Sequence, residues 1–197
     1  MTDLLDRKKN PLNAVRAMPP GGIKIDKAFR SLLITKNYSD ITIDDIVRES
    51  GVNSALIYKY YGDKRGLFYQ VLSEGLDRFH ARLGHDLKGI TGALNKLRKI
   101  VWAHVNLYKE GRVTARIMLM EARSHHSFFA SDAYGKIRQY NAMVRDIIVE
   151  GVSEGVIRSD IPASLINQVL MGAIEHLCLP WLISGDDVSE DEITDAV

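Results

Sequence analysis

The chain has 197 residues, 46% of them hydrophobic, and a formal net charge of +1 at pH 7. This length can bury a real core as one compact unit or two small packed domains, and no uninterrupted run of about 18 apolar residues is present to cross a membrane. The amino terminus has no signal-peptide pattern, so we expect a cytoplasmic protein without a membrane partner. The single cysteine, Cys178, cannot form an internal disulfide and is expected to be a buried structural thiol.

Charge is distributed unevenly along the chain. Residues 1–66 hold 12 Lys and Arg against 8 Asp and Glu, whereas the remaining residues hold 14 against 17. A basic amino-terminal part is typical of a nucleic-acid-binding unit. Residues 1–22 are predicted to be a flexible basic arm, because Pro and Gly residues break any helix that begins there. Its triplet Arg7-Lys-Lys either contacts DNA or belongs to a disordered tail, and both interpretations stay open.

A first helix is predicted from residue 23, and two short capped helices follow it. Thr42 is placed to cap a helix of about two turns, with Asp45 three residues on as its capping-box partner. Gly51 allows the left-handed conformation that ends this helix, and Asn53 can cap the next one. The spacing therefore predicts a helix-turn-helix.

The second short helix, residues 54–61, is the predicted DNA-reading element. On a helical wheel Ile57 and Tyr61 face inward, whereas Ala55 and Lys59 point away from the core. Small, basic and aromatic side chains suit a major groove, where they contact base edges and phosphates. The candidate DNA contacts are Thr42, Ser54, Ala55, Tyr58, Lys59, Tyr60 and Lys64. The alternative is an ordinary amphipathic helix with a solvated lysine.

Lys64 and Arg65 begin the next predicted helix, although cations are ordinarily unfavourable at a helix amino end. A DNA phosphate held between this helix end and the Lys64 ammonium would resolve the conflict. The alternative is two solvated cations that tolerate a small electrostatic cost.

From Lys64 onward the apolar spacing predicts a helical bundle, which makes the fold class all-α. The expected helices span residues 64–85, 91–110, 113–124, 131–154 and 162–184, and a short final helix follows from Ser189 to Val197. Pro180 is expected to kink the helix of residues 162–184. No glycine-rich phosphate loop, Cys/His metal pattern or nucleophile elbow is present.

Polar, aromatic and methionine side chains interrupt the apolar stripes of this bundle. They suggest a mostly apolar effector cavity with few hydrogen-bonding groups, which favours a hydrophobic small molecule over a sugar phosphate. The candidates are His104, Tyr108, Met118, Glu121, His125, Phe128, Tyr140, Asn141, Met143, His176 and Trp181. Any one of them taken alone is more often a core or surface residue than a ligand contact.

Residues 162–184 are apolar on more than one side, so a second buried face implies a partner. Gly172 and Ala173 would let two such helices approach closely across a twofold axis. The candidate dimer contacts are Ile166, Leu170, Gly172, Ala173, Ile174 and Leu177.

The segments Thr42-Ile-Asp-Asp-Ile-Val and Gly51-Val-Asn-Ser-Ala-Leu-Ile-Tyr-Lys-Tyr-Tyr-Gly-Asp-Lys64 resemble the signature of the TetR family of bacterial transcriptional regulators. The resemblance covers about residues 23–72 and departs mildly at Val47, Asn53 and Ala55-Leu56. It implies an all-helical homodimer, with a DNA-binding domain at residues 23–68 and an effector-binding and dimerisation domain at residues 69–197.

We therefore expect a ligand-responsive repressor that binds a palindromic double-stranded DNA operator and needs no cofactor or metal. Two other functions stay open. Glu121 and His125 lie four residues apart and could join His104 or His176 in a metal-dependent enzyme. An architectural DNA-binding protein without a ligand is the third interpretation.

Overall fold

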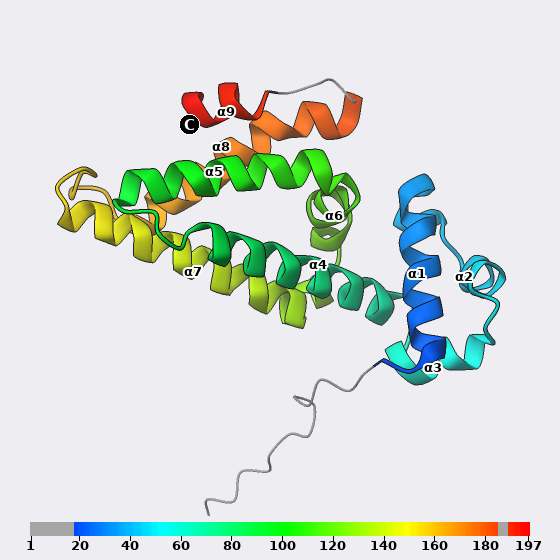
Figure 1. Cartoon of the computed structure of the whole chain (residues 1–197). Coiled ribbons are helices and arrows are strands. Elements are labelled where there is room, and N and C mark those ends of the chain that lie inside the picture. Colours follow the sequence, from blue (N-terminus) through cyan, green and yellow to red (C-terminus); the bar gives the residue numbers. More distant parts are fainter. Residues whose placement is uncertain (1–17, 185–188) are drawn as a thin grey trace, which may run out of the picture.

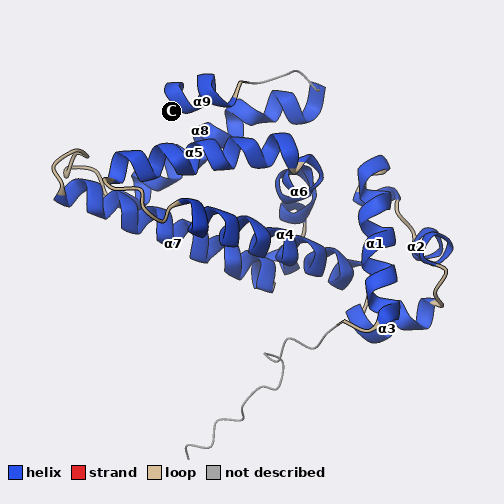
Figure 2. Cartoon of the chain, viewed as in Figure 1, coloured by secondary structure: helices blue, strands red, loops and turns tan. Residues whose placement is uncertain are grey.

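The computed structural model describes residues 18–184 and 189–197, and residues 1–17 of the predicted arm lie outside these ranges. Every regular element in the described part of the chain is helical, so the all-α prediction is confirmed (Figure 2). The elements are α1 (Pro20–Thr35), α2 (Ile43–Ser50), α3 (Ser54–Tyr61), α4 (Lys64–Asp86), α5 (Ala93–Glu110), α6 (Arg112–Arg116), α7 (Asp132–Ser153), α8 (Ala163–Ser184) and α9 (Glu190–Ala196).

Helices α1 to α3 form a small head at one end of the molecule, and α4 runs from the head into the body formed by α4 to α9 (Figure 1). The head and the first turns of α4 share one apolar core, which includes Phe29, Ile46, Ile57 and Phe68. Because α4 contributes to this core and also packs on α7, it joins the two parts mechanically.

Two elements differ clearly from the sequence prediction. Helix α1 begins at Pro20, because a proline in the first turn has no amide that needs a partner. The predicted helix 113–124 is instead the short helix α6, a π-helical turn (Ile117–Glu121) and a 3-10 turn (Ala122–Ser124). Helix α8, by contrast, contains Pro180 and ends at Ser184, as predicted.

Helix α8 is long and apolar enough to meet the length and hydropathy criteria of a membrane span. It packs on α5 and α7 in the body, but only 22% of its most apolar window is buried. An apolar helix with one packed face and one uncovered face is typical of a subunit interface.

Candidate functional site

The caps that hold the two short helices of the head are as predicted. The Thr42 hydroxyl accepts a hydrogen bond from the Asp45 amide (3.1 Å), and the Asp45 carboxylate accepts one from the Thr42 amide (3.0 Å). Hydrogen bonds from Thr42 are the main reason why the pKa of Asp45 is well below its usual value. Asn53 caps α3 by accepting from the Ala55 amide at 2.8 Å. These bonds fix where α2 and α3 begin.

Helix α3 presents a continuous outer face. Ala55, Tyr58 and Lys59 are exposed on it, while Ile57 is fully buried and the Tyr61 hydroxyl donates to the Gly22 carbonyl at 3.0 Å. The wheel prediction of which residues face outward therefore agrees with the structure. This outer face has the size and chemistry of an element that enters a major groove.

Lys64 departs from the sequence expectation. Its ammonium donates to the Tyr38 carbonyl (2.9 Å) and the Ile41 carbonyl (2.7 Å), and it lies 4.2 Å from the centre of the Tyr38 ring. Burial lowers the pKa of Lys64. The Lys64 ammonium is thus bound inside the head by two carbonyls that precede α2, one of which, that of Tyr38, also accepts from the Ile41 amide at 3.3 Å.

Lys59→Ala is expected to lower operator affinity, whereas Lys64→Ala is expected to lower the stability of the head. Loss of the exposed Lys59 should cost about 1–3 kcal/mol of operator affinity and leave the folded head intact. Loss of the Lys64 ammonium should lower the stability of the head by about 1.5–3 kcal/mol for each hydrogen bond to a charged donor. Thermal unfolding and fluorescence anisotropy on operator DNA separate the two effects. Equal melting temperatures would show that the Lys64 contacts contribute nothing.

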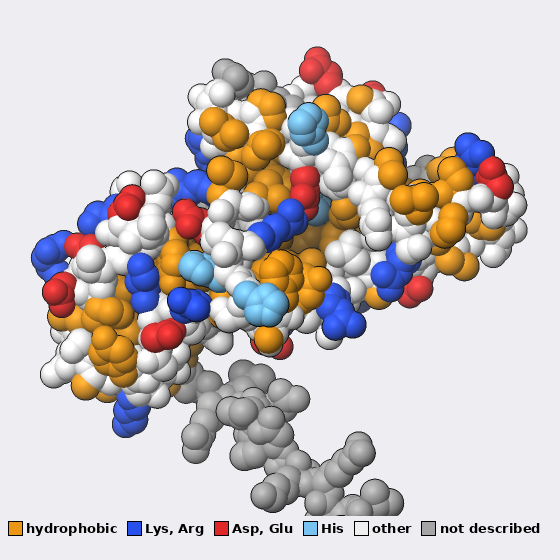
Figure 3. All heavy atoms as spheres, turned by 180° about the vertical axis from the view of Figure 1, so that it is seen from behind, with side chains coloured by type: hydrophobic (Ala, Val, Ile, Leu, Met, Phe, Trp, Pro, Cys, Tyr) orange, Lys and Arg blue, Asp and Glu red, His pale blue; other side chains and the backbone are white. Residues whose placement is uncertain are grey.

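A groove of about 900 Å³ lies between α7 and α8. Three arginines line it, namely Arg123, Arg138 and Arg145, and its other walls include Phe128, Phe129, Ile137 and Met171. On the face opposite to that of Figure 1, the body is hollowed, with hydrophobic side chains in the depression and charged side chains beside it (Figure 3). The groove therefore combines cationic groups with apolar surface, which suits an amphiphilic anion.

Arg123 and Glu175 form a two-pronged ion pair across this region, with N–O distances of 3.0 and 2.5 Å. Both side chains line the large groove and a smaller neighbouring groove that also includes His176. The pair is therefore placed to be opened or reorganised by an anionic ligand. The sequence analysis missed both residues, because an exposed charge on a helix looks like ordinary solvated surface.

A buried aromatic cluster lies deeper in the body. His104 Nδ1 and the Tyr140 hydroxyl are 3.1 Å apart, and His104 stacks on Tyr108 with ring centres 5.6 Å apart. Burial lowers the pKa of His104 to about 4 and raises the pKa of Tyr108. His104 Nε2 and the Tyr108 hydroxyl have no hydrogen-bond partner in the described structure. These three predicted residues are thus brought together as neutral groups.

The other predicted pocket residues are dispersed. Met118 and Phe128 belong to the core shared by the head and α4, and Phe128 also reaches the large groove. His125 packs edge-on to Tyr38. The Glu121 charge partly opposes the lowering of the Lys64 pKa by burial, so Glu121 is close to Lys64, and both residues lie toward the head. Met143 lines the core between α5 and α7, and Trp181 packs beside Tyr108 and Cys178.

The proposed metal ligands are correspondingly separated. His104 is buried in the body, whereas His125 faces Tyr38 and His176 is exposed on α8. Within residues 18–184 and 189–197 no three His, Cys, Asp or Glu side chains are grouped as metal ligands would be.

The uncovered face of α8 is rotated from the predicted one. Ile174 is fully buried against Val105 and Tyr108, so it cannot meet a second copy, and Ile166 and Leu170 are partly buried in the body. Of the predicted contacts, Gly172 and Leu177 are exposed and Ala173 is half-buried. The exposed stripe, called the α8 stripe below, consists of Leu165, Val169, Gly172, His176 and Ile183.

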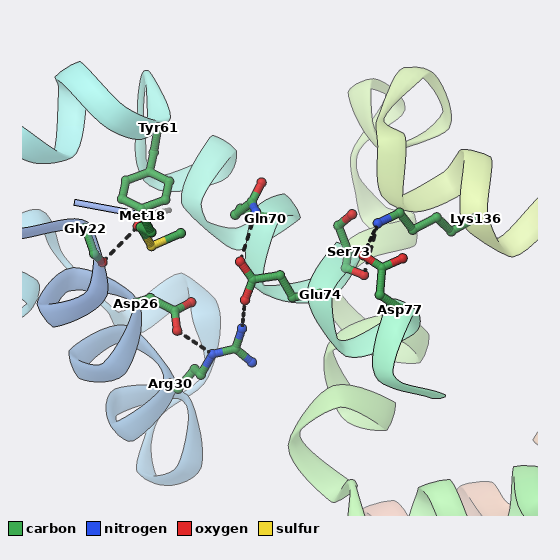
Figure 4. A network of polar contacts seen from close by, with 10 residues as sticks. All are labelled: Met18, Gly22, Asp26, Arg30, Tyr61, Gln70, Ser73, Glu74, Asp77 and Lys136. Atoms are coloured by element: carbon green, nitrogen blue, oxygen red, sulfur yellow. Dashed lines mark hydrogen bonds and ion pairs between the residues drawn. The ribbon is translucent and has the colours of Figure 1, made fainter. Parts of the chain in front are cut away.

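Polar contacts connect the head to the body (Figure 4). Arg30 of α1 pairs with Asp26 (2.8 Å) and with Glu74 of α4 (2.6 Å). One turn further along α4, Asp77 pairs with Lys136 of α7 at 2.5 Å. The head is therefore tied through α4 to a helix that forms a wall of the groove.

A second connection reaches the head from α6. The Arg116 guanidinium donates to the carbonyls of Leu33 (2.6 Å) and Lys36 (3.1 Å) at the end of α1. Arg116 directly precedes the π-helical turn Ile117–Glu121, a type of irregularity that is frequent at functional sites.

Comparison with known proteins finds regulators with a similar sequence and the same architecture. The fatty acid metabolism regulator protein of Bacillus subtilis (strain 168) is 21% identical over 165 residues, which cover 84% of this chain and 85% of that protein. The solved structure of the transcriptional regulator FadR from Bacillus subtilis in complex with stearoyl-CoA has a TM-score of 0.78 at 20% identity, covering 88% of this chain and 94% of that one. The structure of AibR in complex with isovaleryl coenzyme A and operator DNA has a TM-score of 0.71 at 15% identity, covering 89% and 94%.

Two family models match the chain. The model described as "Bacterial regulatory proteins, tetR family" matches residues 25–71, and the model described as "Tetracyclin repressor-like, C-terminal domain" matches residues 91–197. Together they span the head and most of the body, and the second alone covers more than half of the chain. The resemblance found in the sequence is thereby confirmed, and the chain belongs to the tetR family of bacterial regulatory proteins.

Proposed function

We propose that this protein is a homodimeric repressor that leaves its operator when a coenzyme A thioester binds in the groove between α7 and α8. The single observation that carries the effector class is the combination of Arg123, Arg138 and Arg145 with apolar walls in one groove of about 900 Å³. Coenzyme A thioesters carry phosphates at one end and an acyl group at the other. Arginine side chains bind phosphates through charged hydrogen bonds, and an apolar wall packs against the acyl group.

This proposal changes the expectation of a hydrophobic effector, because a coenzyme A thioester joins an acyl group to a phosphate-bearing part. Arg138 and Arg145 lie two turns apart on α7 and are exposed, with no ion-pair partner among the described residues. Two relatives with the same fold are described in complexes with stearoyl-CoA and isovaleryl coenzyme A. The likeness supports the fold, and the arginines of this chain support the ligand class.

The DNA-binding role is proposed for the outer face of α3 together with Thr42, and Lys64 is proposed to position this face instead of contacting phosphate. Residues 23–68 would form the DNA-binding domain and residues 69–197 the effector-binding and dimerisation domain. As a DNA-binding regulator, the protein would act in the cytoplasm.

The effector class is tested by replacing Arg138 and Arg145 with glutamine. The double variant is expected to bind octanoyl-CoA at least tenfold more weakly, because hydrogen bonds between charged groups are worth about 1.5–3 kcal/mol each. Isothermal titration calorimetry at two salt concentrations should also show a smaller salt dependence. Arg82→Gln is the control, since Arg82 pairs with Glu110 away from this groove. Unchanged affinity in the double variant would refute the proposed phosphate contacts.

A second copy of the chain is proposed to cover the α8 stripe. Val169 of the stripe is 65% exposed, and the stripe residue Gly172 and the nearby α8 residue Ser164 also line the groove. Packing two stripes against each other would therefore bury apolar surface and also enclose one wall of the groove.

Val169→Glu is expected to convert the dimer to a monomer and to lower operator affinity by more than about tenfold, because a buried unpaired charge is strongly unfavourable and half of the DNA contacts are lost. Sedimentation equilibrium measures the first effect and DNA titration the second. Leu94→Glu is the control, since Leu94 is similarly exposed (53%) but lies on α5. A dimeric Val169→Glu variant would place the interface elsewhere.

A further inference from the structure

The floor of the groove contains an amide pair that joins its two helices. Asn167 of α8 is 5% exposed, and its Nδ2 donates to Asn141 Oδ1 of α7 at 3.0 Å. Asn141 Nδ2 in turn donates to the Ile137 carbonyl at 3.0 Å. Both asparagines line the groove.

The orientation of this pair follows from its last acceptor. A main-chain carbonyl only accepts, so the atom of Asn141 that faces Ile137 must be the NH₂ group. The Asn141 oxygen then faces Asn167, so the Asn167 NH₂ group must donate the hydrogen bond between them. The remaining atom of the Asn167 amide is therefore Oδ1, which can only accept. This assignment follows from the chain of hydrogen bonds and does not depend on how either amide was placed.

Asn167 Oδ1 has no hydrogen-bond partner in the described structure. A buried polar atom without a partner costs about 1–3 kcal/mol, so a groove that keeps one is suited to a ligand that brings the missing group. Because this atom accepts, the ligand must bring an N–H or O–H donor.

We propose that Asn167 Oδ1 accepts a hydrogen bond from an amide N–H of the pantetheine arm of a coenzyme A thioester, and that Asn141 holds it in position. This inference rests on the proposed function. The pantetheine arm lies between the phosphates and the acyl group and carries two secondary amides. The groove holds the corresponding groups: Arg138 and Arg145 are exposed on α7 on either side of Asn141, Asn167 is buried in its lining, and apolar side chains complete it.

The test is a cycle of two proteins and matched ligands. Wild type and Asn167→Leu are titrated by calorimetry with octanoyl-CoA and with two analogues in which an ester oxygen replaces one or the other pantetheine N–H. For one of the two analogues, wild type should lose roughly tenfold in affinity, whereas Asn167→Leu should bind that analogue and octanoyl-CoA equally. Leucine keeps the branched shape of asparagine, with two methyl groups in place of the amide oxygen and nitrogen, but cannot accept a hydrogen bond.

Gln168→Leu is the matched control, because Gln168 also lines the groove but is exposed. It should discriminate between the ligands as wild type does, and thermal unfolding shows whether Asn167→Leu remains folded. If Asn167→Leu does not fold, Asn141→Leu is used in the same cycle. It removes the oxygen that accepts from Asn167 Nδ2 and so orients the Asn167 amide, and it should reduce the discrimination. If octanoyl-CoA binds wild type but neither analogue is discriminated, the Asn167 contact is refuted while the proposed function stands. If no thioester binds, the proposed function fails and the inference with it.

Discussion

Gly66→Ala is expected to abolish sequence-specific operator binding. Gly66 lies in the first turn of α4, where its amide donates to Asp63 Oδ1 at 2.7 Å. A Cβ atom at this position would overlap the carbonyl oxygen of Tyr61, the last residue of α3. Because the obstructing atom belongs to the main chain, no side-chain rotation can relieve the overlap. The turn between α3 and α4 must open, and the DNA-reading face moves with it.

The expected loss of operator affinity exceeds roughly a hundredfold, since several base contacts worth about 1–3 kcal/mol each are misplaced together. Fluorescence anisotropy with operator and random DNA measures it. Gly84→Ala is the control, because Gly84 lies in the same helix and a Cβ there meets nothing within 4 Å. The control should bind as wild type and gain up to about 1 kcal/mol of stability from helix propensity. Operator binding within twofold of wild type in Gly66→Ala would show that the turn adapts.

The features of the head that the sequence predicted are local. A capping box needs only Thr42 and Asp45 at the correct spacing, and the inward position of Ile57 follows from the helical period. Such features depend on residues within one or two turns of each other. They were therefore predicted without any knowledge of how the helices pack.

The features that the sequence did not predict depend on contacts between distant segments. Lys64 reaches carbonyls 23 and 26 residues earlier in the chain, and Asn141 meets Asn167 across two helices. Ile174 and Val169 are both apolar residues of α8, and only the packing of α8 on the body decides which is buried. Periodicity indicates that α8 has two apolar faces, but it does not say which of them meets the core.

The contacts that could couple the groove to the head also join distant segments, so the sequence did not predict them. Arg116 has no sequence signature, yet its guanidinium satisfies two carbonyls at the end of α1 that have few other partners. On its other side the chain continues into the π-helical turn, whose Met118 packs in the core shared with α4. We infer that a shift of α6 would act on α1 through the two hydrogen bonds of this charged donor.

Arg116→Met is expected to uncouple the effector from DNA. The methionine keeps the apolar stem but removes both hydrogen bonds to α1, so octanoyl-CoA should still bind the groove with wild-type affinity. Its effect on operator affinity should fall from the 5- to 150-fold typical of allosteric coupling to roughly twofold or less. DNA titrations with and without saturating octanoyl-CoA give this ratio, and calorimetry checks that the ligand still binds.

The neighbouring arginine of the same helix separates this explanation from a general loss of structure. Arg112 directs its guanidinium to the Leu182 carbonyl of α8 at 3.3 Å and lies over the Trp181 ring, away from α1. Arg112→Met therefore removes a comparable contact inside the body and should keep the full response to octanoyl-CoA. If both variants lose the response equally, α6 acts through its packing on the body. If Arg116→Met keeps it, the coupling runs through α4 and the Arg30–Glu74 pair, which connects α1 with the helix that packs on α7.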